Sequence, residues 1–126
     1  MPNANGYTEP LLNQQQWFRL LRNLNRGVVG ARHRRKHTRF PMEGEATVLV
    51  LPPEQQESNP KTLQGSLIEA SEEGLSFTIG QSPVPEGTHV GIRLNIANHI
   101  AYVQGKVTSC TKKINNHRIG VLLEFA

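Results

Sequence analysis

Cysteine is nearly absent from this sequence: Cys110 is the only one among 126 residues. One cysteine cannot form an intramolecular disulfide or a zinc site built from several cysteines. We interpret Cys110 as a small apolar side chain on a strand. The five histidines show no HExxH spacing, so we expect no bound metal.

Long hydrophobic runs are absent as well. The longest, residues 48–51, contains four apolar residues, whereas a membrane-spanning helix needs about 18. Residues 1–30 lack the basic segment and following apolar segment of a signal peptide. These absences predict a cytoplasmic chain.

Catalytic motifs are also missing. The sequence has no nucleophile elbow, P-loop, GxGxxG loop or pair of catalytic carboxylates. We therefore expect no catalytic residues, no cofactor, and a chain that is not an enzyme on its own. Aromatic residues make up only 6% of the sequence, and Phe77, Tyr102 and Phe125 are dispersed. A small barrel that stacks the bases of single-stranded nucleic acid needs more aromatic side chains than this, so that class is an alternative rather than the first choice.

Positive charge is concentrated at the beginning of the chain. Residues 1–42 hold eight Lys or Arg and one acid, whereas residues 43–126 hold six basic residues and nine acids. Such asymmetry indicates a basic segment made for an anionic partner: nucleic acid, a nucleotide or an anionic membrane. Within it, residues 31–39 carry five formal positive charges and no acid. Because like charges repel, we expect this segment to be mobile until a counter-charge binds.

One amphipathic helix is predicted before this basic segment. Pro10 suits a first helical turn, and Gly27 with Gly30 supplies the end. We expect the helix to pack on the domain or on a neighbouring chain; a helix lying on a membrane surface is the alternative. Residues with helical spacing form its apolar face: Leu11, Trp17, Leu20, Leu21, Leu24 and Val28.

After residue 42 the apolar pattern has a period of two, which is typical of strands. Short strands without intervening helices favour an antiparallel barrel or sandwich. The predicted strands cover residues 43–51, 62–70, 74–79, 88–97, 100–110 and 117–125.

Two short motifs stand out in this arrangement. The first places Arg35 and Arg39 immediately before the first strand, and the second places Glu69, Ser71 and Gly74 in the turn between the second and third strands. Together they resemble the two signatures of the PilZ domain, a bacterial receptor module for cyclic di-GMP: Arg-x-x-x-Arg, then Asp or Asn-x-Ser-x-x-Gly. Residues 67–68, 75–77 and 119–125 are also similar to the family. The resemblance covers residues 32–126.

The resemblance implies an all-β fold, a six-stranded antiparallel β-barrel preceded by the helix and a basic linker. It divides the chain into residues 1–30, a tail with the amphipathic helix, and residues 31–126, the barrel domain with an arginine switch segment at residues 31–39. The implied ligand is cyclic di-GMP. Arg34, directly before the first motif, is implied as a further ligand residue, with one or two ligands left open.

The chemistry of the motif residues suits this ligand. Guanidinium groups of Arg35 and Arg39 can bind phosphate oxygens or guanine O6 and N7. A carboxylate such as Glu69 accepts hydrogen bonds from guanine N1–H and N2–H₂, although the family has Asp or Asn there. Ser71 can either bind a phosphate or cap the turn, and Gly74 permits a positive φ and close backbone approach.

The predicted function is therefore a regulatory domain that couples cyclic di-GMP binding to an effector protein or to a fused catalytic domain, such as a cellulose synthase-type glycosyltransferase. We expect no DNA or RNA partner, and contact with the inner face of the membrane only indirectly or peripherally through a partner. A PilZ-like domain that acts through protein contacts without binding the ligand is the other alternative.

Overall fold

The computed structural model describes residues 10–24, 40–51, 61–80 and 83–125. One helix, α1 (Gln14–Leu24), precedes six strands. The strands are β1 (Phe40–Val50), β2 (Lys61–Ala70), β3 (Gly74–Ile79), β4 (His89–Ile96), β5 (His99–Lys112) and β6 (His117–Leu123). No helix in these ranges is long and apolar enough to span a membrane.

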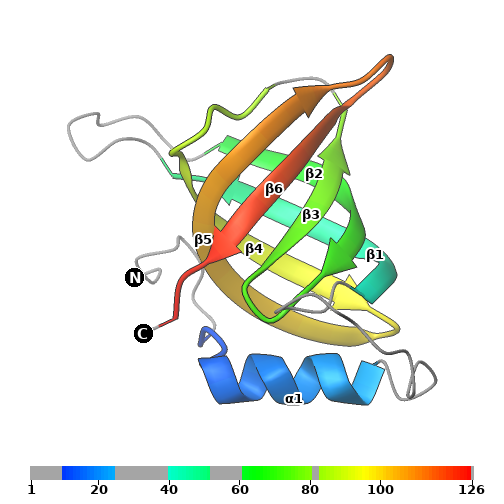
Figure 1. The fold of residues 1–126 in the computed structure, drawn as a ribbon, viewed down its shortest axis with the longest axis vertical. Coiled ribbons are helices and arrows are strands. Elements are labelled where there is room, and N and C mark those ends of the chain that lie inside the picture. Colours follow the sequence, from blue (N-terminus) through cyan, green and yellow to red (C-terminus); the bar gives the residue numbers. More distant parts are fainter. Residues whose placement is uncertain (1–9, 25–39, 52–60, 81–82, 126) are drawn as a thin grey trace, which may run out of the picture.

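The six strands form a closed antiparallel barrel in the order β1-β2-β3-β6-β5-β4 (Figure 1). This confirms the predicted fold and decides between barrel and sandwich. Strand β1 begins at Phe40, before the predicted residue 43. The reason is a register shift between Pro41 and Gly44, since an irregular stretch of ladder tolerates a proline that cannot donate a hydrogen bond.

The hydrophobic core fills the barrel, because alternate residues of each strand point inward. On β4, for example, Val90, Ile92 and Leu94 are fully buried while Arg93 lies between them on the outer face. The largest completely buried side chains are Trp17, Phe77, Ile92, Leu94 and Ile119, followed by four valines.

Helix α1 begins with a capping box that differs from the predicted start. The backbone N–H of Gln16 donates to Asn13 Oδ1 at 2.8 Å, and the backbone N–H of Asn13 donates to Gln16 Oε1 at 2.9 Å. These two bonds satisfy groups that a helix end leaves unpaired. Pro10 therefore lies before the helix, and its predicted place in the first turn was wrong. The predicted end at Gly27 and Gly30 lies outside the described residues.

The helix lies across one end of the barrel (Figure 1), where its apolar face joins the barrel core. Trp17 and Leu21 are buried, and Leu20 and Leu24 are partly buried as predicted. Phe18, which the predicted face omitted, also packs against the core. Leu11 precedes the helix, and Val28 lies outside the described residues.

We predict that Trp17→Ala lowers the free energy of unfolding by about 3–5 kcal/mol, the usual cost of truncating a buried large aromatic residue. Trp17 is 0% exposed, and its indole N–H has a partner in the barrel. Urea denaturation followed by circular dichroism measures the change. Arg19→Ala, at an exposed position of the same helix, is the control and should leave stability nearly unchanged. Equal stabilities of the two variants would show that the helix does not belong to the core.

Candidate functional site

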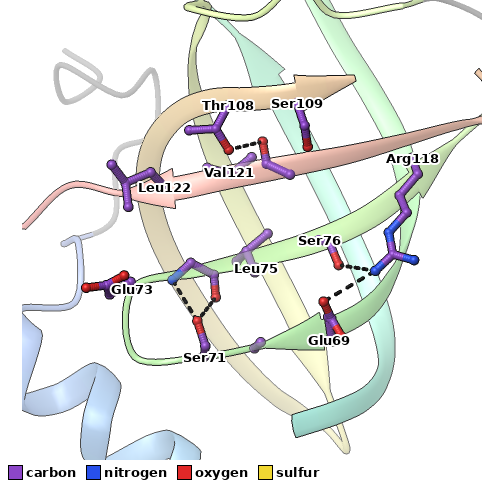
Figure 2. A pocket seen from close by; sticks show the side chains of 13 residues that line it. Glu69, Ser71, Glu73, Leu75, Ser76, Thr108, Ser109, Arg118, Val121 and Leu122 are labelled. Carbon is purple, nitrogen blue, oxygen red and sulfur yellow. Dashed lines mark hydrogen bonds and ion pairs between the residues drawn. The ribbon is translucent and has the colours of Figure 1, made fainter. Parts of the chain in front are cut away.

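The candidate site is a pocket of about 360 Å³ on the outer face of the barrel (Figure 2). Its walls come from the end of β2, the β2–β3 turn, and strands β3, β5 and β6. The volume lies near the lower end of the range for small-molecule sites. The residues that matter for its chemistry are Glu69, Ser71, Gly74, Ser76 and Arg118.

A bulge in β2 places Glu69 on this outer face. The register with β3 shifts between the pairs Leu67–Phe77 and Glu69–Ser76, leaving Ile68 as the extra residue. Strict alternation from the buried Leu67 would turn Glu69 inward. The bulge reverses the alternation, so Glu69 shares a face with Ser76.

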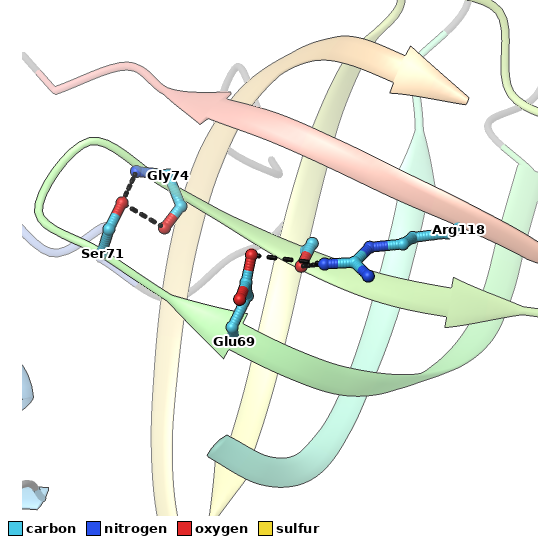
Figure 3. A network of polar contacts seen from close by, with 5 residues as sticks. Glu69, Ser71, Gly74 and Arg118 are labelled. Carbon is cyan, nitrogen blue, oxygen red and sulfur yellow. Dashed lines mark hydrogen bonds and ion pairs between the residues drawn. The ribbon is translucent and has the colours of Figure 1, made fainter. Parts of the chain in front are cut away.

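Glu69 belongs to a polar network that crosses three strands (Figure 3). Arg118 Nη2, from β6, donates to Glu69 Oε1 on β2 at 3.3 Å and to Ser76 Oγ on β3 at 3.5 Å. The side chains of Arg118 and Glu69 are 42% and 26% exposed. The pair is therefore partly desolvated and still within reach of a ligand.

Arg118 was missed by the sequence analysis. Its place on the outer face follows from alternation beside the buried Ile119. Its position next to Ser76 and Glu69 follows only from the pairing of β3 with β6. A sequence pattern gives the first fact but not the second.

Ser71 caps the turn, which is one of its two predicted roles. The backbone N–H of Ser71 donates to the Gly74 carbonyl at 2.8 Å, and the Gly74 N–H donates to Ser71 Oγ at 3.2 Å. The Ser71 hydroxyl lies 3.3 Å from the Gly74 carbonyl and donates to it. The hydroxyl thus closes the turn from the side that faces the pocket.

Gly74 acts through close approach and not through its φ angle. Among the described glycines only Gly87 has a positive φ, so the predicted left-handed role of Gly74 was wrong. The predicted close approach is confirmed: a Cβ at this position would lie 2.3 Å from the Val121 carbonyl oxygen of β6.

The turn is also held from outside. Trp17 Nε1 of α1 donates to the Ser71 carbonyl at 2.9 Å, and the Leu123 N–H donates to the Glu73 carbonyl at 2.8 Å. Helix α1 and the end of β6 therefore fix the turn on two sides.

The structure brings three of the predicted ligand residues together, namely Glu69, Ser71 and Gly74. The other three, Arg34, Arg35 and Arg39, lie outside the described residues, together with the rest of the basic segment 31–39. Their contribution to the site remains a prediction.

A family model of the PilZ domain matches residues 33–125. The chain belongs to the PilZ domain family. The solved PilZ domain of YcgR from Escherichia coli, with cyclic di-GMP, is similar in structure, with a TM-score of 0.57 and 14% sequence identity. The match covers 72% of this chain and 78% of that one. At this identity the likeness shows the PilZ fold. The comparison with curated proteins gives no match.

We predict that Gly74→Ala destabilises this PilZ domain by about 1–3 kcal/mol, the usual cost of forcing an extra carbon into a packed site. The new methyl group would separate β3 from the Val121 carbonyl. Gly80→Ala is the matched control, because a Cβ at Gly80 meets nothing within 4 Å. Thermal unfolding of both variants compares them. A Gly74→Ala protein as stable as Gly80→Ala would contradict the close-approach role.

Proposed function

We propose that this PilZ domain is a cyclic di-GMP-binding regulatory domain. The ligand binds in the outer pocket, between the Glu69-Ala70-Ser71-Glu72-Glu73-Gly74 turn and the arginine segment that contains Arg34, Arg35 and Arg39. The observation that carries the proposal is the pocket itself, which gathers the residues of the second motif on one solvent-facing wall.

The family and the structural neighbour support this ligand. The chain matches the PilZ family model over most of its length, and the similar PilZ domain from Escherichia coli is described with cyclic di-GMP. In this proposal the domain binds cyclic di-GMP and regulates a partner, and any chemical reaction is carried out by the partner.

The charges of the pocket explain why the arginine segment is needed. The charged side chains among its described lining residues are Glu69, Glu73 and Arg118, so the wall carries a net negative charge. Two phosphates would be repelled by such a wall without further cations. Arg35 and Arg39 supply the guanidinium groups for them, and Arg34 adds a third.

Helix α1 is the proposed route from the ligand to a partner. It precedes the arginine segment in the sequence, with residues 25–30 between them, and Trp17 contacts the carbonyl of Ser71 in the binding turn. In this proposal a ligand that shifts the turn acts on the helix through Trp17, and one that shifts the segment acts through the chain that follows the helix. The partner is an effector protein or a fused catalytic domain such as a glycosyltransferase. The domain acts in the cytoplasm, and it reaches the inner face of the membrane only through that partner.

A second candidate is a PilZ domain that acts through protein contacts alone. The observation that favours it is the ion pair between Glu69 and Arg118, because it occupies an acid that the first candidate uses for guanine. Calorimetric titration with cyclic di-GMP separates the two candidates. Single-stranded RNA in the same experiment tests the nucleic-acid alternative.

We predict that Arg35→Ala and Arg39→Ala each weaken cyclic di-GMP binding by about 10- to 100-fold, since each removes a bidentate contact of about 1–3 kcal/mol. The thermal midpoint without ligand should hardly change, because residues 32–39 contain no apolar side chain for a core. Isothermal titration calorimetry measures the affinities. Arg22→Ala, at an exposed position of α1, is the control for loss of one positive charge. Parental affinity in both motif variants would exclude the arginine segment from the site.

A further inference from the structure

The ion pair on the pocket wall sets a hydrogen-bond donor beside an acceptor. Arg118 Nη2 and Glu69 Oε1 are 3.3 Å apart (Figure 3), and the same Nη2 donates to Ser76 Oγ at 3.5 Å. Both groups lie on the outer face, at the edge of the same pocket. A flat ligand that offers a donor next to an acceptor would complement them.

Arg118 has donors left for such a ligand. Both of its hydrogen bonds to described residues use Nη2, so Nη1 and Nε contact no acceptor in the described part of the chain. The side chain is 42% exposed. A carboxylate offers about four lone-pair positions, so accepting a bond from Arg118 does not by itself prevent Glu69 from accepting others.

Guanine carries the complementary pattern on its Watson–Crick edge. Its O6 accepts, while the neighbouring N1–H and N2–H₂ donate. Adenine shows the opposite order, with a donor at N6 and an acceptor at N1. An arginine–carboxylate pair therefore selects guanine over adenine, as cytosine does in a base pair.

We propose that Arg118 is a specificity-determining residue that donates to guanine O6, while the adjacent Glu69 accepts from N1–H and N2–H₂. This inference rests on the proposed binding of cyclic di-GMP. The pair favours a base over a phosphate, because a guanidinium already neutralised by a carboxylate attracts an anion only weakly. The phosphates are left to the arginine segment.

The rest of the pocket suits a base. Gly120 lines the pocket without a side chain, and a Cβ there would lie 2.5 Å from Ser109 Oγ. Leu122 lines the same pocket and is 47% exposed (Figure 2). Leu122 lies four residues from Arg118 on β6, so it offers an apolar surface in the same pocket for the part of the ligand that lies away from the pair.

The test compares cyclic di-GMP with cyclic di-IMP, which lacks only the N2 amine. Both ligands keep O6, so Arg118 can donate to either one. Only cyclic di-GMP has the N2 amine, and in the proposal this amine contacts Glu69 alone. Titration calorimetry gives both affinities for the parent, Arg118→Gln and Glu69→Gln. The control is Arg93→Gln, the same substitution on the outer face of β4, which is not adjacent to β3 or β6 in the barrel.

We expect Arg118→Gln to lower the affinity for both ligands equally, by about 10- to 100-fold, because a hydrogen bond involving a charged group is lost. The preference for cyclic di-GMP over cyclic di-IMP should survive in this variant. Glu69→Gln should reduce that preference by at least tenfold. Arg93→Gln should behave as the parent.

The other outcomes overturn the inference in different ways. Parental affinities in Arg118→Gln would show that Arg118 does not contact the ligand. Loss of the cyclic di-GMP preference in Arg118→Gln would make it only a positioning residue for Glu69. A parent that binds neither ligand would refute the proposed function itself. If Arg118→Gln does not fold by circular dichroism, Arg118→Lys keeps the charge, and an equal but smaller weakening of both ligands is expected.

Discussion

The pairing of β3 with β6 is the contact on which both the barrel and the candidate site depend. It joins residues 74–79 to residues 117–122, which are far apart in the sequence, and it closes the sheet. The pairing needs Gly74, because only a residue without a Cβ allows the Val121 carbonyl to approach so closely. Its consequence for the site is that Arg118 lies beside Ser76 on the outer face. Barrel closure and site assembly therefore share one interaction.

The turn that follows β2 is held by contacts within the chain itself. Ser71 and Gly74 close it with their own hydrogen bonds, Trp17 holds it from the helix, and the backbone of Leu123 holds it from β6. A preformed acceptor surface avoids the entropy cost of ordering that surface on binding. The Trp17 contact also ties the turn to helix α1, which connects this part of the site to the proposed output.

The strand pattern predicted the fold well because each strand has one buried face, and burial imposes a period of two. The pattern failed where the structure departs from regular alternation. The bulge at Ile68 turns Glu69 outward, and no periodicity shows a bulge. Arg118 was missed because a local sequence pattern does not give the order of strands in the sheet. Strand β6 pairs with β3, which is not consecutive with it in the sequence. The start of α1 was misplaced although the Asn13–Gln16 capping box is visible in the sequence. Pro10 was read instead as the first helical turn, where proline is also common.

The longer acid at residue 69 is explained by the distance that the ion pair must cross. Glu69 and Arg118 stand on β2 and β6, with β3 between them, so their backbones are roughly 10 Å apart, twice the usual strand spacing. At 3.3 Å the pair is already near the limit of a hydrogen bond. An aspartate would withdraw the carboxylate by about 1.5 Å, one carbon–carbon bond, and would leave Arg118 with Ser76 but without a carboxylate partner. Glutamate in place of aspartate or asparagine and arginine on β6 are thus two parts of one arrangement. In this chain the extra methylene group lets the acid at residue 69 pair with Arg118, and this is the pair that we propose reads a guanine edge.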